Sequence, residues 1–337
     1  MSFANRWASV IRTAAWLSLL LPAMACGGGS QSPPSPTPVS TPTPTPWNLT
    51  GRVITTLSGG PVARASVNAF IATAESAADG SFTLTATPAP AGSQAVTVTA
   101  EGYRPRETVI KWPRTNELVI DLASTAKPFD ETFFNQLARD GLDQPTKDYA
   151  LYRWASQLQF YLKTQDEFGR PLSADVLDTV RRGIQRGVQY YTAGTYQAVI
   201  EEAPVTRPER LGWINVVPLQ VIPEGDYCGL SSTVGGNPMT IKLRIDRCGC
   251  GSIKIPIDVV MHEVGHAVGM FHVSGEDNIM NGHAWFNCRD VVPTALEQYH
   301  ARLIYARPRG NHSPDRDPGE FSLGLPGLGQ EQPPARP

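Results

Sequence analysis

The sequence has no excess of charge of either sign. Its 337 residues include 29 Lys and Arg against 31 Asp and Glu, which gives a formal net charge of −2. Proteins that bind nucleic acid or an anionic membrane surface usually carry a basic excess or a basic stripe. The short basic run at 181–186 falls within an expected helix, where a solvated helix face accounts for it. The composition therefore argues against nucleic acid as a partner.

The apolar run near the N-terminus is too short to cross a membrane. Residues 14–25 read AAWLSLLLPAMA and follow Arg6 and Arg12, a pattern typical of a signal peptide. We therefore expect residues 1–25 to direct export. The run ends in PAMAC, which resembles the lipobox of bacterial lipoproteins, although Ala23 replaces the usual leucine. This resemblance makes Cys26 the lipidation candidate and implies a lipid anchor at the bacterial cell envelope. Cleavage before an unmodified Cys26, which would give a secreted protein, is the alternative.

Proline is plentiful, with 30 residues in the chain, but it is concentrated in two places. Residues 27–46 read GGGSQSPPSPTPVSTPTPTP, which favours extended polyproline II over any packed core. We expect a Pro/Thr-rich linker at 26–46. The end of the chain, from 308 to 337, is rich in proline, glycine and charge, and we expect a disordered tail there. These boundaries leave two folded regions, 47–124 and 128–307.

The first region shows the alternation of short β-strands. Phe82/Leu84, Val96/Val98 and Val119/Asp121 are spaced for one strand face, and Asp79-Gly80 predicts a tight hairpin. The segments GRV, GGPVARASVNA, ADGSFTLT and VTAEGYRPRE resemble the carboxypeptidase regulatory-like, prealbumin-like module. The resemblance implies a small antiparallel β-sandwich at 47–124. A folded spacer is its expected role, with ligand or surface binding as the alternative.

The second region mixes helices and strands. Leu158, Phe160 and Leu162 alternate as in a strand, while Val176, Val180, Ile184 and Val188 recur every four residues as in an amphipathic helix. Further strands are expected at 196–200, 212–217, 230–234 and 240–245. The order of these elements predicts an α+β fold.

Histidine is scarce, yet three of the six histidines lie in MHEVGHAVGMFH, residues 261–272. Pro256 and Asp258 favour a helix start, and Val260, Val264 and Val268 give it a buried stripe. His262 and His266 then share one helix face. Gly269 can reverse the chain and bring His272 round as a third ligand. Three imidazoles around one zinc ion leave a coordination position open, as in catalytic sites.

Glu263 supplies the group that such a site needs for hydrolysis. Its carboxylate can take a proton from a zinc-coordinated water and pass it to a leaving amine. His262, Glu263, His266, Gly269 and His272 together complete the pattern HExxHxxGxxH, which resembles the metzincin zinc peptidases. The resemblance implies a metzincin-like catalytic domain at 128–307, with a mixed sheet, an active-site helix and a C-terminal helix.

The resemblance extends beyond the ligands. DNIMNGHAW places Met280 where metzincins carry a methionine turn, which implies an apolar floor beneath the metal. Thr294 and Glu297 have capping-box spacing for the C-terminal helix at 293–305, and 230–234 is the candidate substrate-pairing edge strand. Val273 and Gly282 differ from residues kept in several branches, so the subfamily stays open. No histidine precedes His262, so one zinc ion is expected, and no cysteine-switch segment is visible.

Cysteine is also scarce. Apart from Cys26, the chain holds Cys228, Cys248, Cys250 and Cys288. Export favours disulfides. Cys248 and Cys250 are too close to pair with each other, so each should pair with Cys228 or Cys288, in either arrangement. A four-cysteine zinc site is the alternative.

The remaining histidines are less informative. His283 follows the methionine turn and is a candidate substrate contact, although a solvated turn histidine is the preferred interpretation. His300 and His312 receive no role.

The sequence therefore predicts an exported, monomeric zinc metalloendopeptidase that acts on peptide or protein substrates. Its only membrane contact is the expected lipid anchor. The alternatives are a surface adhesin with a vestigial metal site and a hydrolase of a non-peptide bond. Retention of Glu263 with all three ligands argues against the adhesin, because a purely structural site needs no base.

Overall fold

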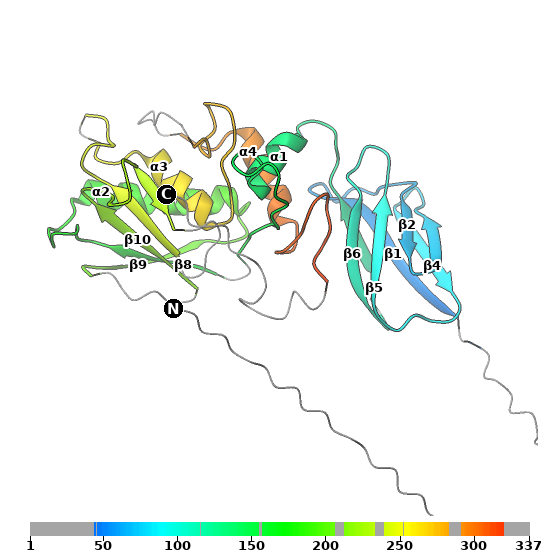
Figure 1. Cartoon of the computed structure of the whole chain (residues 1–337). Helices are drawn as coiled ribbons and strands as arrows, with labels where there is room; N and C mark the ends of the chain where they lie inside the picture. Colours follow the sequence, from blue (N-terminus) through cyan, green and yellow to red (C-terminus); the bar gives the residue numbers. More distant parts are fainter. Residues whose placement is uncertain are drawn as a thin grey trace, which may run out of the picture. The chain divides into compact units, whose positions relative to one another are not determined.

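We describe the protein from a computed structural model (Figure 1), which places residues 44, 46–114, 116–154, 157–205, 212–232, 239–251, 253–282 and 291–319. The expected signal peptide, Cys26 and most of the linker lie outside these residues, as do His283, Cys288 and residues 320–337. Within the described part of the chain, no helix combines the length and apolar character needed to cross a bilayer.

The N-terminal region is all-β, as expected. Its strands are β1 (Trp47–Thr55), β2 (Ser66–Ala69), β3 (Ala72–Glu75), β4 (Ser81–Ala86), β5 (Gly92–Thr99), β6 (Arg106–Trp112) and β7 (Leu118–Leu122). They form a three-stranded sheet in the order β4-β1-β7 and a four-stranded sheet in the order β3-β2-β5-β6. β1 and β7 run parallel, and the other pairs are antiparallel. One hydrophobic core takes side chains from both sheets, which is the arrangement of a sandwich.

The strand alternation explains which side chains fill this core. Phe82, Leu84, Val96 and Val98 all point inward and are buried. Val119 points outward and is 53% exposed, because its neighbours in β7 take the inward positions. The expected hairpin at Asp79-Gly80 is wrong in one respect: the turn joins β3 to β4, and these strands belong to different sheets.

The second region has a mixed α+β fold. A five-stranded sheet in the order β11-β12-β10-β8-β9 contains β8 (Leu158–Lys163), β9 (Ala198–Ala203), β10 (Trp213–Leu219), β11 (Gly229–Ser231) and β12 (Met239–Arg244). The four helices are α1 (Glu131–Arg139), α2 (Ala174–Tyr191), α3 (Ile257–Ala267) and α4 (Ala295–Tyr305). All strand pairs are parallel except β11 with β12. The short antiparallel β11 therefore forms one edge of the sheet.

Helices α2 and α3 pack closely because α2 carries two glycines where they meet. A Cβ atom added to Gly183 would lie 2.5 Å from Cβ of Val260, and one added to Gly187 would lie 2.7 Å from Cγ1 of Val264. The apolar face of α2, with Val180, Ile184 and Val188, belongs to the same core as these valines. The contact fixes the fully buried α3 against the apolar face of the longer α2.

The chain after α4 forms a buried polar cluster with the sandwich. Arg307 is 3% exposed in its side chain and binds Asp315 at 2.8 Å, and it also binds Asp121 of β7. Arg106 of β6 contacts Asp317 at 2.8 Å. Residues 315–317 hydrogen-bond through their backbone to Glu107 of β6. The composition of residues 308–337 predicted a disordered tail. This prediction is wrong for residues 308–319, in which Asn311 and Asp315 are almost fully buried.

Candidate metal centre

Helix α3 presents His262 and His266 from one face. All of its residues from Ile257 to Ala267 are buried, because α2 and the sheet cover it. Pro256 stands at the N-cap, one position earlier than expected, and Asp258 in the first turn favours the positive end of the helix dipole. The expected i, i+4 placement of the two histidines is therefore present in the structure.

The chain reverses at Gly269 directly after this helix. Gly269 has φ of +106°, and a Cβ atom there would lie 2.2 Å from the carbonyl oxygen of Tyr152. Two side chains satisfy the last helix carbonyls: Trp154 Nε1 donates to Ala267 O at 2.7 Å, and the Tyr305 hydroxyl donates to Val268 O at 2.9 Å. The turn therefore requires glycine at position 269, and hydrogen bonds from Trp154 and Tyr305 stabilise it.

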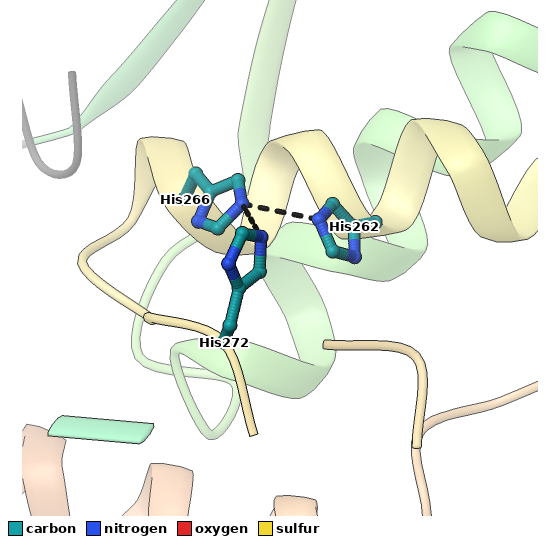
Figure 2. Close-up of side chains that lie close together, drawn as sticks. All are labelled: His262, His266 and His272. Carbon is teal, nitrogen blue, oxygen red and sulfur yellow. Dashed lines mark hydrogen bonds between the residues drawn. The ribbon is translucent and has the colours of Figure 1, made fainter. Parts of the chain in front are cut away.

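This reversal brings His272 to the other two imidazoles (Figure 2). Nε2 of His266 lies 3.1 Å from Nε2 of His262 and 3.2 Å from Nε2 of His272. The potential ligand atoms of all three lie within 4.8 Å of one another. Tetrahedral zinc with Zn–N bonds of 2.0–2.1 Å would separate its ligand nitrogens by about 3.3 Å. The spacing therefore fits one ion of this size.

The other ring nitrogen of each histidine, Nδ1, has an oxygen partner of its own. Nδ1 of His262 lies 2.6 Å from Ile279 O, and Nδ1 of His266 lies 2.8 Å from Met270 O. Nδ1 of His272 lies 2.9 Å from Oδ2 of Asp143. Because carbonyl and carboxylate oxygens accept hydrogen bonds, each Nδ1 is placed to donate to one of them, and the neutral tautomer that does so leaves Nε2 free to bind a cation. The three Nε2 atoms lie on the side where the rings converge, as expected of a candidate metal site.

Burial disfavours the protonated form of His262. Desolvation, with a smaller repulsion from His272, lowers the pKa of His262 to about 4. His262 and His266 are 6% and 8% exposed, whereas His272 is half-buried. Burial thus favours the uncharged form of His262, which is the form that binds metal, and solvent reaches the cluster on the side of His272.

Glu263 lies against the sheet edge. Its Oε2 accepts a 2.7 Å hydrogen bond from the hydroxyl of Ser231, and a Cβ atom at Gly229 would lie 2.4 Å from its Oε1. Strand β11 therefore passes directly over this carboxyl group and requires glycine there. Burial raises the pKa of Glu263 to about 7, and the Ser231 hydrogen bond opposes that rise. This value suits a group that both takes and gives a proton near neutral pH.

Met280 packs against α3 between the two helical histidines. A Cβ atom at Gly265 would lie 2.3 Å from its sulfur, and its own backbone N–H donates to Glu297 Oε1 at 2.9 Å. Glu297 also completes the capping box with Thr294 that the spacing predicted for α4. Gly282 approaches the His272 ring, since a Cβ atom there would lie 3.0 Å from Nδ1. The loop after His272 is therefore shaped around the cluster.

The described residues contain one of the two expected disulfides. Cys228 and Cys248 form a disulfide, at a sequence separation of 20. This bridge agrees with one of the two expected arrangements and removes the four-cysteine zinc site. Pairing of Cys250 with Cys288 remains a prediction, because Cys288 lies outside the described residues.

The two remaining described histidines lie away from the cluster. His300 is buried among Phe129, Phe133 and Phe134, and its Nε2 accepts from the backbone N–H of Asp130. His312 lies 3.5 Å from Asp148. Neither lies in the group of His262, His266 and His272.

Two residues of this site were not predicted. Asp143 and Ser231 each contact a functional side chain from a distant part of the sequence, 129 and 32 residues away. Neither lies in a recognisable motif. The edge strand expected at 230–234 gave the only available signal for Ser231.

Comparison with known proteins gives a family match for the N-terminal region and similarity to solved structures. Residues 48–123 match the carboxypeptidase regulatory-like domain. No match to the chain was found among curated proteins. A chain of the solved structure described as "GM1 bound form of the ECX AB5 holotoxin" is similar over 50% of this chain and 92% of its own length, with 11% identity and a TM-score of 0.34. The family match supports the N-terminal sandwich as a module of the carboxypeptidase regulatory-like type.

Proposed function

We propose that the protein is an exported zinc-dependent endopeptidase, held at the bacterial cell envelope by a lipid on Cys26. One observation carries the enzymatic proposal: the Nε2 atoms of three imidazoles converge, with that of His266 3.1 and 3.2 Å from the other two, and a buried carboxyl group follows the first histidine. Three protein ligands with an open position are typical of catalytic rather than structural zinc.

Each residue of the site has its own role in the proposed reaction. His262, His266 and His272 would hold the ion, which when bound polarises both the attacking water and the scissile carbonyl. Glu263 takes the proton of that water and returns it to the leaving amine. Ser231 holds the Glu263 carboxylate on its Oε2 side at 2.7 Å. The HExxHxxGxxH pattern makes a metzincin-like domain the proposed architecture of the second region.

A peptide substrate is favoured by the position of β11. This strand ends the sheet order and passes over Glu263. An open strand edge can bind an extended peptide through its backbone. The sandwich carries no residue of the proposed site, so we assign it an accessory role outside the reaction. We expect the enzyme to act as a monomer.

The test uses the purified protein with a mixture of denatured proteins. We expect cleavage that a zinc chelator stops and that added zinc restores. Glu263→Gln should lose cleavage while still holding about one zinc per chain, because it leaves all three ligands in place. Glu276→Gln, which alters an exposed glutamate after the ligands, should cleave as the wild type does.

Two results would contradict the proposal. Equal cleavage by wild type and Glu263→Gln would remove Glu263 from the base role. Stoichiometric zinc without cleavage of any of a broad set of substrates would favour the adhesin with a vestigial site.

A further inference from the structure

We propose that Asp143 is the positioning residue of the metal centre, which orients His272 and thereby sets how tightly the site retains zinc. The inference rests on the proposed zinc site and goes beyond it, because Asp143 lies outside the HExxHxxGxxH pattern. It starts from a difference between the three ligands. His262 and His266 are carried by α3, whereas His272 follows the Gly269 reversal and has no helix of its own.

The partners of the three Nδ1 atoms show the same difference. His262 and His266 donate to backbone carbonyls, of Ile279 and Met270. His272 donates instead to a carboxylate, Oδ2 of Asp143, at 2.9 Å. Both side chains are partly exposed, at 23% for His272 and 33% for Asp143. The ligand nearest solvent therefore has the one charged partner among the three.

Helix α1 ties the segment around His272 on both sides. Phe271 N–H donates to Leu137 O at 2.8 Å, and Ser274 N–H donates to Gln136 Oε1 at 3.0 Å. The backbone that carries His272 is therefore attached to α1 immediately before and shortly after the ligand. Its ring is placed by an element that precedes it by more than a hundred residues.

The turn that carries Asp143 is attached to the same helix. Asp140 ends α1 with φ of 61°, in the left-handed region, and its carbonyl accepts from Gln144 N–H at 2.8 Å. Gly141 N–H donates back to Asn135 O at 3.0 Å. Because Asp143 lies inside this closed turn, its carboxylate is presented to His272 from a fixed backbone.

The expected effect follows from the chemistry of the pair. A carboxylate that accepts the Nδ1 proton fixes the tautomer that leaves Nε2 free for metal, and it makes that nitrogen a stronger donor. Loss of such a partner typically weakens metal binding by about 10–100-fold. Backbone carbonyls fix the same tautomer without a full negative charge. His272 should therefore depend more on its partner than the helical ligands do.

The experiment measures zinc affinity of the full chain by competition with a chromophoric chelator, which does not depend on catalysis. We expect Asp143→Ala to bind zinc about 10–100-fold more weakly than the wild type. Asp143→Asn keeps an acceptor but loses the charge, so it should fall between the two. Asp277→Asn removes an equal charge from an exposed site after the ligands and should bind within about threefold of the wild type. The visible spectrum of the cobalt-substituted protein should change in the Asp143 variants and stay constant in Asp277→Asn.

The outcomes separate this inference from the proposed function. If the wild type binds no zinc, the proposed site itself fails. If the wild type binds one zinc and both Asp143 variants bind it equally well with an unaltered cobalt spectrum, only the positioning role fails. An equal loss in Asp277→Asn would also overturn it, because the effect would then be one of net charge. Should Asp143→Ala not fold, the near-isosteric Asp143→Asn decides by the same two measurements.

Discussion

The hydroxyl of Ser231 donates a 2.7 Å hydrogen bond to Oε2 of Glu263 and also lies 3.2 Å from the Glu263 carbonyl oxygen. The edge strand β11 and the active helix α3 are thus joined at the proposed general base. The hydrogen bond favours the charged carboxylate, against the burial that disfavours it.

Ser231→Ala should therefore reduce kcat for peptide cleavage by roughly tenfold, with little change in KM. A hydrogen bond to a charged group is worth about 1.5 kcal/mol or more, which corresponds to that factor. Its loss also raises the pKa of Glu263, so the acid limb of the pH–rate profile should move to higher pH. Ser231→Thr, which keeps the hydroxyl, should restore most of the rate. An unchanged profile in the alanine variant would exclude this role.

Glu263→Gln should stabilise the zinc-free protein at high pH. Burial raises the pKa of this carboxyl from 4.5 to about 7, so above pH 7 folding confines a charged carboxylate that the unfolded chain would leave in water. Its cost is at most about 3 kcal/mol and disappears as pH falls below 4.5, the pKa of this carboxyl in the unfolded chain. Urea unfolding of both proteins at pH 5 and pH 8 should show a gain for the variant that is much larger at pH 8. His262 is present in both proteins, so its contribution cancels; a gain equal at both pH values would contradict the prediction.

Gly269→Ala should destabilise the protein strongly. The new Cβ atom would meet Tyr152 O at 2.2 Å and would adopt a positive φ. We expect a loss of about 3 kcal/mol or more in the free energy of unfolding. Gly59→Ala is the matched control, because Gly59 has φ of +69° with nothing near its Cβ position. The control should lose only about 1 kcal/mol. Similar losses in the two variants would mean that the Tyr152 contact does not matter.

Arg307→Met should lower the free energy of unfolding by about 3–5 kcal/mol. The change removes the arginine that pairs at 2.8 Å with the almost fully buried carboxylate of Asp315, and it removes one of the two arginines that pair with Asp121. Arg316→Ala removes an exposed pair with Glu107, 3.8 Å apart, and should cost less than about 1 kcal/mol. Chemical denaturation of both variants measures the difference. A loss of less than about 1 kcal/mol for Arg307→Met would contradict the prediction, because the buried carboxylates would then tolerate the removal of the arginine.

The features that local spacing controls could be predicted from the sequence. The valine stripe of α2, the i, i+4 histidines and the capping box of α4 each depend on residues within one or two helical turns, and all three are present. The chain reversal at Gly269 was also accessible, because a positive φ favours glycine.

The features that depend on distant partners could not be predicted. Helix α1 has no long apolar stripe in sequence, and the contact of Asp143 with His272 spans 129 positions. The composition of residues 308–319 indicated disorder because it counts polar residues without their partners. Arg307, Asn311 and Asp315 satisfy one another in a buried cluster, so their polarity does not keep the segment in solvent.

The backbone pairing of residues 315–317 with Glu107 also bears on self-association. β6 is an edge strand of its sheet. The backbone N–H of Glu107 donates to Asp315 O, and the Glu107 carbonyl accepts from Asp317 N–H, so these two groups are not available to pair with another chain. An exposed edge strand can pair with a strand of another copy of the protein, and in many proteins a loop covers such an edge. Proteolytic cleavage between α4 and Asp315 would expose this edge of β6. The shortened protein should therefore aggregate although its histidine cluster is intact.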